Sequence, residues 1–111
     1  MEFTQIADFV TPECTVCGGI LKPDIVFFGE FIPTEKFSEA SALLQSAGAL
    51  LIAGSSLVVN SGIRLLDQAS KRRLPVVIVN RGVTKGDPRA TVKINAGASE
   101  TLAELALRLS I

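Results

Sequence analysis

The apolar residues of this chain fall into short runs of strand length and longer stretches with helical spacing. Residues 49–53 and 76–79 are uninterrupted apolar runs, which are typical of strands covered on both faces in a parallel sheet. The β-branched and aromatic stretch 25–28 predicts a short buried strand, and residues 92–94 predict another. We therefore expect four short strands.

Three stretches have apolar residues at helical spacing. The first begins at Thr34, which we expect to cap it, and ends at Gly48. The second runs from about Ser61 to Arg72, and Ser99 is expected to cap the third. The positions expected to be buried are Phe37, Ala40, Leu43 and Leu44 in the first helix, Ile63, Leu65, Leu66 and Ala69 in the second, and Leu102, Leu105, Ala106 and Leu109 in the third.

Strands and helices alternate along the chain, except that the last two strands follow each other across a loop at 81–89. This order predicts an α/β fold with a parallel sheet and flanking helices. In such sheets ligands bind beyond the carboxyl ends of the strands. Polar residues follow three of the predicted strands, at 29–30, 54–56 and 80–81. These clusters are the candidate ligand contacts.

Each cluster also has a plain structural explanation. The turn Gly54-Ser55-Ser56 can present backbone N–H groups and hydroxyls to an anion or a ribose, but Gly-Ser turns after strands are common. Asn80 either binds ribose hydroxyls or only forms a turn, and Glu30 is either a catalytic carboxylate or a solvated turn residue. Taken singly, these residues do not decide between binding and local structure.

The composition removes several kinds of chemistry. The 111 residues include no His, and 11 Lys and Arg balance 11 Asp and Glu. Without His the chain by itself cannot form a Ser-His-Asp or Cys-His system, and zero net charge argues against a nucleic-acid-binding face. No apolar run approaches the roughly 20 residues that span a bilayer, and the first ten residues carry two acidic and no basic side chains, unlike a signal peptide. We expect a cytoplasmic protein with neither nucleic acid nor membrane among its partners.

The two cysteines form a Cys14-x-x-Cys17 sequence followed by two glycines. Two such thiols can supply half of a tetrahedral Cys₄ zinc site. The alternative is a redox dithiol, which would lie at a junction between a strand and a helix. Because this pair precedes Lys22-Pro23 and a predicted strand, the zinc interpretation is favoured.

Four segments taken together resemble the sirtuins, the NAD-dependent protein-lysine deacylases. They are Cys14-x-x-Cys17-Gly-Gly, the stretch Leu-Lys-Pro-Asp-Ile-Val-Phe-Phe-Gly-Glu at 21–30, the stretch Gly-Ser-Ser-Leu-Val-Val-Asn at 54–60, and Val79-Asn80. The resemblance covers nearly the whole chain from Cys14 onward. It implies the C-terminal half of a Rossmann-like sheet, over residues 21–111, preceded at 1–20 by part of a zinc ribbon.

The resemblance also implies site residues, by position. The implied NAD contacts are Gly54, Ser55, Ser56, Asn80, Arg81, Gly97 and Ala98. The implied contacts to the acyl-lysine peptide are Val26, Phe28, Gly29, Glu30 and Val59. The implied zinc ligands are Cys14 and Cys17, as the second pair of a set of four. Ser55 departs from the family's more usual Thr.

The family's Gly-Ala-Gly-Ile-Ser loop, its Gln-Asn-x-Asp stretch, its catalytic His and its first Cys pair have no counterpart in this chain. No catalytic residue is therefore expected here, and the chain is expected to be inactive by itself. The alternative is a non-catalytic module that binds nucleotides or proteins. The expected partners are an acyl-lysine protein or peptide and either the missing N-terminal half or a second copy of this chain.

Overall fold

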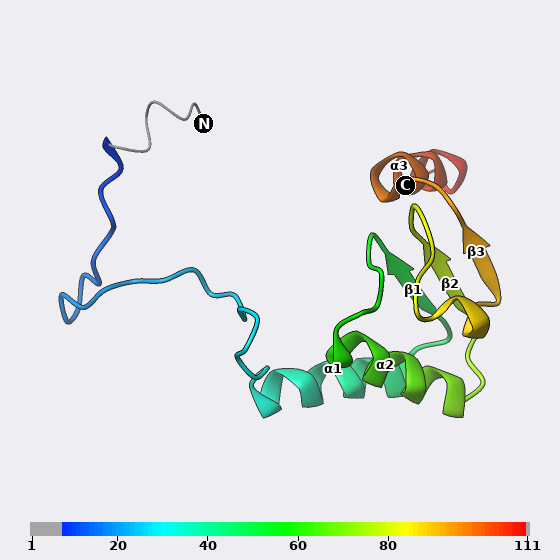
Figure 1. Cartoon of the computed structure of the whole chain (residues 1–111), viewed down its shortest axis with the longest axis horizontal. Helices are drawn as coiled ribbons and strands as arrows, with labels where there is room; N and C mark the ends of the chain where they lie inside the picture. The colour runs from blue at the N-terminus through cyan, green and yellow to red at the C-terminus, as the bar shows by residue number, and fades with distance from the viewer. Residues whose placement is uncertain (1–7, 111) are drawn as a thin grey trace. The chain divides into compact units, whose positions relative to one another are not determined.

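The computed structural model describes residues 8–110, and the chain divides into two units, Met1–Phe31 and Ile32–Ile111. All regular helices and strands of the described part lie in the second unit (Figure 1). In chain order they are α1 (Thr34–Ser46), β1 (Leu50–Ala53), α2 (Asn60–Lys71), β2 (Val76–Val79), the 3₁₀ helix η2 (Asp87–Arg89), β3 (Val92–Ile94) and α3 (Ala98–Arg108). Within residues 8–110, no helix has the length and apolar character needed to cross a membrane.

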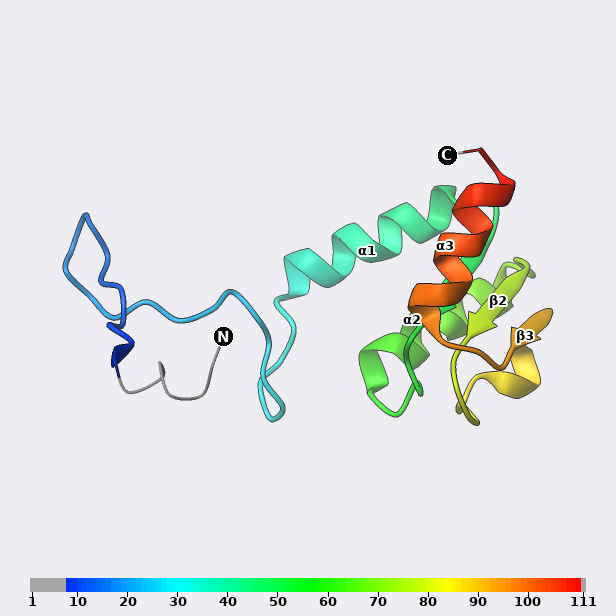
Figure 2. The same cartoon turned by 90° about the horizontal axis from the view of Figure 1, so that it is seen from above.

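The three strands form a parallel sheet in the order β1-β2-β3. Leu50 lies opposite Val76, and Val77 of the same central strand lies opposite Val92. Helices α1 and α2 lie on one side of the strands and α3 lies on the other (Figure 1), and Figure 2 shows the same elements from above. The predicted α/β class, a parallel sheet with flanking helices, is confirmed.

The hydrophobic core forms between the sheet and the pair α1 and α2. Its buried members are Leu44, Leu57, Leu66, Ala69, Val76 and Ile78. Five of these come from helices or β2, where the apolar pattern predicted burial. Leu57 comes from the loop after β1 and is only 4% exposed, which no periodicity indicated. Full burial of a leucine contributes about 1.5–3 kcal/mol relative to its exposure.

The predicted burial of the helix faces holds for α2, holds in part for α1, where Phe37 and Ala40 are half-buried, and fails in α3. Leu44 is the one buried residue of α1, and Leu43 is 72% exposed. Helix α3 has no buried residue, although Leu102, Leu105, Ala106 and Leu109 were expected to be covered. An amphipathic face is buried only where another element packs on it, and the described residues cover neither Leu43 nor the apolar face of α3.

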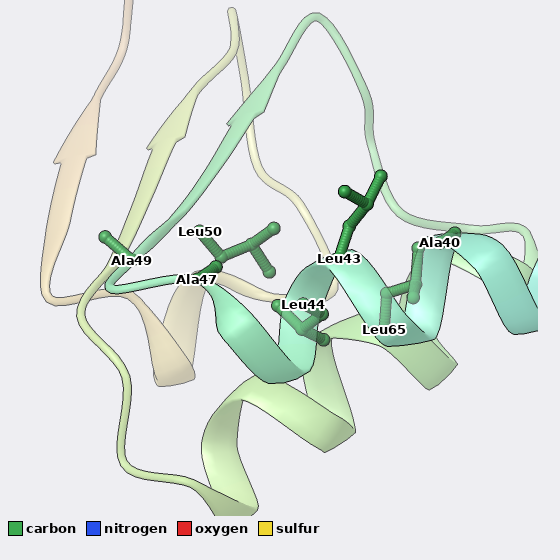
Figure 3. Close-up of a pocket in the computed structure, with 7 residues that line it drawn as sticks. All are labelled: Ala40, Leu43, Leu44, Ala47, Ala49, Leu50 and Leu65. Carbon is green, nitrogen blue, oxygen red and sulfur yellow. The ribbon is translucent and has the colours of Figure 1, made fainter.

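An apolar cavity of about 200 Å³ adjoins the uncovered face of α1. It lies between α1, the start of β1 and α2 (Figure 3). Its lining residues are Ala40, Leu43, Leu44, Ala47, Ala49, Leu50 and Leu65. Hydrophobic side chains thus line a hollow at the surface of this unit instead of a closed interior.

The expectation that both apolar runs are covered on two faces is correct for β2 and wrong for β1. Three of the four residues of β2 are buried, whereas burial alternates along β1, where Leu51 is 49% exposed. The physical reason is position, because β2 is central and β1 is an edge strand with one neighbour. Continuous hydrophobicity alone does not distinguish these two places.

The predicted buried strand at 25–28 is absent from the structure. This segment is irregular and ends in a turn in which the Glu30 N–H donates to the Phe27 carbonyl at 3.0 Å. Its side chains are exposed, Phe28 to 94%. A strand requires a partner backbone to accept and donate its hydrogen bonds, and the described residues provide none for this stretch.

The two predicted helix caps are also wrong. Pro33 and Gly97 occupy the N-cap positions of α1 and α3, so Thr34 and Ser99 lie inside the helices. Neither N-cap makes a side-chain hydrogen bond. Pro33 has no side-chain acceptor, and α1 begins with the backbone bond from the Phe37 N–H to the Pro33 carbonyl at 3.1 Å.

Candidate functional site

The carboxyl ends of the three strands meet at one edge of the sheet, where the first candidate residues follow β1 and β2. The Gly54 N–H donates to the Val79 carbonyl at 2.9 Å, and the Asn80 N–H donates to the Ile94 carbonyl at 3.1 Å. Gly54 and Asn80 therefore continue the backbone pairing of the strands by one residue. Their positions are fixed by the sheet and not by a free loop.

Gly54 lies directly against the beginning of α3. Its φ is +69°, a conformation that glycine adopts without steric cost, and a Cβ added there would lie 3.5 Å from the Ala98 Cβ. That distance is ordinary van der Waals contact, so the positive φ is what requires glycine. The structure thus brings together two candidate nucleotide contacts that are separated by more than forty residues in sequence.

Arg81 is held over the first turn of α3 by Glu100. Its Nη2 donates to both carboxylate oxygens, at 3.1 and 2.9 Å. A Cβ at Gly97 would lie 2.9 Å from Arg81 Nη2, so the absence of a side chain at Gly97 leaves room for this ion pair. Both side chains are mostly exposed, and such a pair orients Arg81 more than it stabilises the fold.

Glu100 is a residue of this edge that sequence reasoning missed. It lies in the first turn of α3, where a carboxylate is favoured by the helix dipole. That placement is common in helices, and nothing in the sequence pairs Glu100 with Arg81. Glu100 and Arg81 come together only because the loop after β2 lies beside α3 in the folded structure.

Ser55 and Ser56 are both used in the local structure of the turn after β1. The Ser55 Oγ accepts the Leu57 N–H at 3.2 Å, and the Ser56 carbonyl accepts the Lys85 N–H at 3.1 Å. Both residues are exposed at the sheet edge. The Ser55 hydroxyl can still donate its own proton to a ligand.

The side chain of Asn80 also serves the local backbone, because its Nδ2 donates to the Arg81 carbonyl at 3.1 Å. This bond shapes the turn that carries Arg81. The turn-forming role and a ligand-binding role, which the sequence left as alternatives, are compatible: the amide oxygen is not needed for this bond.

In the first unit, the segment around the two cysteines forms a tight turn. Glu13 and Ile20 make an isolated antiparallel bridge, and the Cys14 N–H donates to the Gly19 carbonyl at 2.9 Å. The Gly18 N–H returns a bond to the Cys14 carbonyl, also at 2.9 Å, and Gly18 has a φ of +73°. Backbone bonds and one glycine in the left-handed region therefore close the turn.

Backbone N–H groups point at both sulfurs in this turn. The Val16 N–H lies 3.4 Å from the Cys14 Sγ, and the Gly19 N–H lies 3.4 Å from the Cys17 Sγ. The pKa of Cys14 is lowered, first by hydrogen bonding from the Cys17 backbone, then from the Val16 backbone, and then from the Cys17 thiol. These donors favour the thiolate, which is the form that binds a metal.

The turn fits part of a zinc site better than a redox centre. Both cysteines are free, and an irregular segment follows them where a redox dithiol would begin a helix. Over the described range, no three His, Cys, Asp or Glu residues gather into a metal-binding group. Cys14 and Cys17 are thus suited to supply two ligands, and a complete tetrahedral site needs two more.

The candidate peptide contacts are divided between the two units. In the first unit, Gly29 has a φ of +87°, and exposed Glu30 pairs with Lys22 at 3.6 Å, while Val26 and Phe28 are exposed. In the second unit, Val59 is the N-cap of α2 and is 48% exposed. All of these residues therefore present accessible backbone or side-chain atoms.

Comparison with known proteins identifies relatives of this chain. The model of the Sir2 family matches residues 2–61. NAD-dependent protein deacetylase 1 of Mycobacterium avium is 49% identical over 106 residues, which are 96% of this chain and 38% of that protein. The NAD-dependent protein deacetylase of Bordetella pertussis is 42% identical over 105 residues, 95% of this chain and 38% of that protein. The chain thus spans about two-fifths of the length of these curated relatives.

Solved structures have the same fold. A structure described as Sir2 bound to acetylated peptide matches with a TM-score of 0.76 and 32% identity, over 97% of this chain and 45% of that chain. A structure described as Sir2-p53 peptide-NAD+ matches with a TM-score of 0.75 and 32% identity, over 96% of this chain and 45% of that chain.

Proposed function

Because this chain belongs to the Sir2 family, we propose that it is the part of an NAD-dependent protein deacetylase that binds the adenosine side of NAD and the acyl-lysine substrate. Its sheet and helices are part of the family's Rossmann-like fold. The proposal rests above all on one observation. Gly54, Arg81, Gly97 and Ala98 meet at the carboxyl edge of the sheet, where nucleotides bind in such folds.

The residues proposed to hold NAD are Gly54, Ser55, Ser56, Asn80, Arg81, Gly97 and Ala98. Gly54 leaves the backbone open to close approach, and the hydroxyls of Ser55 and Ser56 can bond ribose or phosphate oxygens. The Arg81 guanidinium, already oriented by Glu100, offers further donors. When bound, NAD supplies the ADP-ribose group that accepts the acyl group.

The substrate is proposed to pair along the backbone of Val26, Phe28, Gly29 and Glu30, and at Val59. Support comes from the β-prone segment 25–28, whose backbone has no strand partner among the described residues. An extended peptide can add to such a backbone by main-chain hydrogen bonds, which tolerate many side chains. The solved relative described as bound to acetylated peptide supports this class of partner.

Cys14 and Cys17 are proposed to supply two of the four ligands of a structural zinc ion. Support comes from the N–H groups directed at both sulfurs and from the lowered pKa of Cys14. The other two thiolates would come from the remainder of the deacetylase or from a second copy of the chain.

The second candidate function is a non-catalytic nucleotide-binding or protein-interaction module. The absence of His from all 111 residues favours it, because this chain then offers no imidazole as a general base. Under either proposal, deacetylation requires another polypeptide segment to act with this one.

Calorimetric titration of the 111-residue chain with ADP-ribose tests the nucleotide site. We expect saturable binding that weakens about tenfold or more in Gly54→Val, because the branched side chain opposes the positive φ and fills the space against Ala98. Gln45→Ala, an exposed amide position on α1, is the control and should bind as wild type. No binding by the wild-type chain would refute the nucleotide proposal.

A separate assay tests whether this chain catalyses the reaction by itself. The chain is incubated with NAD and an acetylated peptide, and free nicotinamide is measured. We expect none from this chain alone. Release of nicotinamide by the purified chain would show that its own residues suffice for catalysis and would contradict the absence of catalytic residues proposed here.

A further inference from the structure

Leu57 combines three properties that rarely occur together. It is a non-glycine residue with a φ of +61°, a region that L-residues avoid. Its side chain is 4% exposed and belongs to the hydrophobic core. Every other residue of the loop 54–59 is exposed, so Leu57 is the single side chain by which this loop is anchored in the interior.

The Leu57 side chain packs against two glycines. A Cβ added at Gly62 would lie 3.2 Å from Leu57 Cδ2, and one added at Gly86 would lie 2.5 Å from Leu57 Cδ1. The Cβ at Gly86 would also lie 2.8 Å from Leu66 Cδ2. Any side chain at Gly86 would therefore require Leu57 and Leu66 to shift, although the φ of Gly86, −94°, does not itself require glycine.

The loop that carries Gly86 is held by a network of polar bonds. The Asp87 carboxylate accepts the Thr84 hydroxyl and the Thr84 N–H. Lys93 of β3 donates to both Asp87 oxygens and to the Gly82 carbonyl, each at 2.9 Å. The network fixes the loop to the sheet, and the side chains of Asp87 and Lys93 are about three-quarters buried.

The same loop is bonded to the turn after β1. The Lys85 N–H donates to the Ser56 carbonyl at 3.1 Å, and the Leu57 N–H donates to the Ser55 Oγ at 3.2 Å. Leu57 thus lies between Ser56, a proposed nucleotide contact, and Val59, a proposed peptide contact. Its backbone conformation determines the direction in which the chain leaves one contact and reaches the other.

We propose that Leu57 is a positioning residue, which holds the nucleotide-binding turn 54–56 and the peptide-contacting Val59 in one geometry, with Gly86 and the Asp87–Lys93 pair as its supports. The inference deepens the proposed function and rests on it for the two ligands. Misplacing a binding group by about 1 Å can cost on the order of 100-fold in activity, so an anchor at this point affects both contacts.

Four variants of the 111-residue chain test the proposal. Leu57→Ala removes the anchoring side chain, and Leu57→Met keeps a side chain of similar volume. Asp87→Asn weakens the Asp87–Lys93 pair that supports the loop. Leu107→Ala is the matched control, because Leu107 is 75% exposed on α3. Each variant is titrated with ADP-ribose, and amide hydrogen exchange is followed residue by residue.

We expect Leu57→Ala to bind ADP-ribose about tenfold or more weakly, Leu57→Met to stay within about twofold of wild type, and Leu107→Ala to match it. In Leu57→Ala the amides of position 57 and of Lys85 should lose protection while those of β2 keep it. Wild-type affinity and protection in Leu57→Ala, or equal losses in Leu107→Ala, would overturn the proposal.

Two further outcomes are also decisive. If Leu57→Ala loses protection throughout β2, the Asp87→Asn variant decides the outcome. A local loss of exchange protection at Lys85 together with weaker ADP-ribose binding supports the proposal. Unchanged protection and unchanged binding in Asp87→Asn overturn it. If the wild-type chain does not bind ADP-ribose, the nucleotide proposal fails, and the exchange data alone decide whether Leu57 positions the loop.

Discussion

The guanidinium of Arg72, just after the last residue of α2, donates a hydrogen bond to the carbonyl of Leu44 near the end of α1. A second bond reaches the Ala47 carbonyl at 3.4 Å. The last carbonyls of a helix lack the regular partners of its interior. The Leu44 carbonyl accepts the Ala47 N–H at 3.1 Å, and the cation from the neighbouring helix adds a second donor there and also reaches the Ala47 carbonyl. In the sequence, the basic run 71–73 looks like a solvated helix terminus, and one of its three residues is in fact a tertiary cap.

Replacing Arg72 by Ala should lower the free energy of unfolding by about 1–2 kcal/mol, because the hydrogen bonds from a charged donor to the Leu44 and Ala47 carbonyls are lost. Lys71→Ala, at the adjacent position, should change it by less than about 0.5 kcal/mol. Urea unfolding followed by circular dichroism measures both. Equal losses in the two variants would contradict the capping role of Arg72.

Stability should depend on the protonation of Asp87 at acid pH. The pKa of this carboxyl lies below its ordinary value of 3.8, first because the Thr84 hydroxyl bonds the carboxylate and second because Lys93 does. A lowered folded-state pKa means that the unfolded chain takes up the proton first as the pH falls. The stabilisation is therefore complete above the ordinary value and is lost as the pH falls through the lowered one.

Asp87→Asn isolates this contribution from that of the other acidic groups. The variant should be less stable than wild type near neutral pH, and the difference should shrink as the pH falls from about 5 toward about 2. Urea midpoints over this range measure the difference. A stability difference between variant and wild type that stays constant with pH would mean that the shape of the Asp87 side chain matters and its charge does not.

Cys14 should react with iodoacetamide faster in the folded chain than in the chain unfolded by urea. The lowered pKa of Cys14 raises the fraction of thiolate at neutral pH, and the thiolate is the reactive form. Mass spectrometry of peptides after timed alkylation measures the two rates. Saturating zinc should slow the folded reaction, and rates that are equal in both states would show that the turn does not activate this thiol.

The uncovered apolar faces predict self-association of the isolated chain. Leu43 is 72% exposed beside an apolar cavity, and exposed contiguous apolar surface favours association. Sedimentation at micromolar concentration should show species larger than a monomer for wild type and fewer of them for Leu43→Glu. Gln45→Glu, on the same helix, is the control for added charge. A monomeric wild type would refute this prediction.

The sequence predicted most of the regular structure, and the failures have physical causes. The strands at 76–79 and 92–94 and the extent of α1 and α2 agree with the structure to within a few residues. The strand at 25–28 was predicted from β-branched and aromatic residues, but a strand exists only with a partner. Burial of the faces of α1 and α3 likewise depends on neighbouring elements, which a periodic pattern cannot supply.

The site was accessible to sequence reasoning only in part. Gly54, Asn80 and the cysteine pair stood out because glycine turns, strand ends and paired thiols have local signatures. Leu57 and Glu100 did not, because a leucine in a loop and an acidic residue in a first helical turn are unremarkable by themselves. Their roles depend on Gly86 and Arg81, which are distant in sequence and adjacent in space.

The amino-acid sequence by itself determined the α/β order of elements, the absence of imidazole chemistry and the family membership that its motifs indicate. These depend on local propensity, composition and residue identity, all of which can be read along the chain. The tertiary structure decided that Gly54 meets Ala98, that Glu100 orients Arg81 and that Leu57 is seated against Gly62 and Gly86. Such pairings arise when segments far apart in the chain pack together, because the shape of one side chain then limits which residue fits beside it.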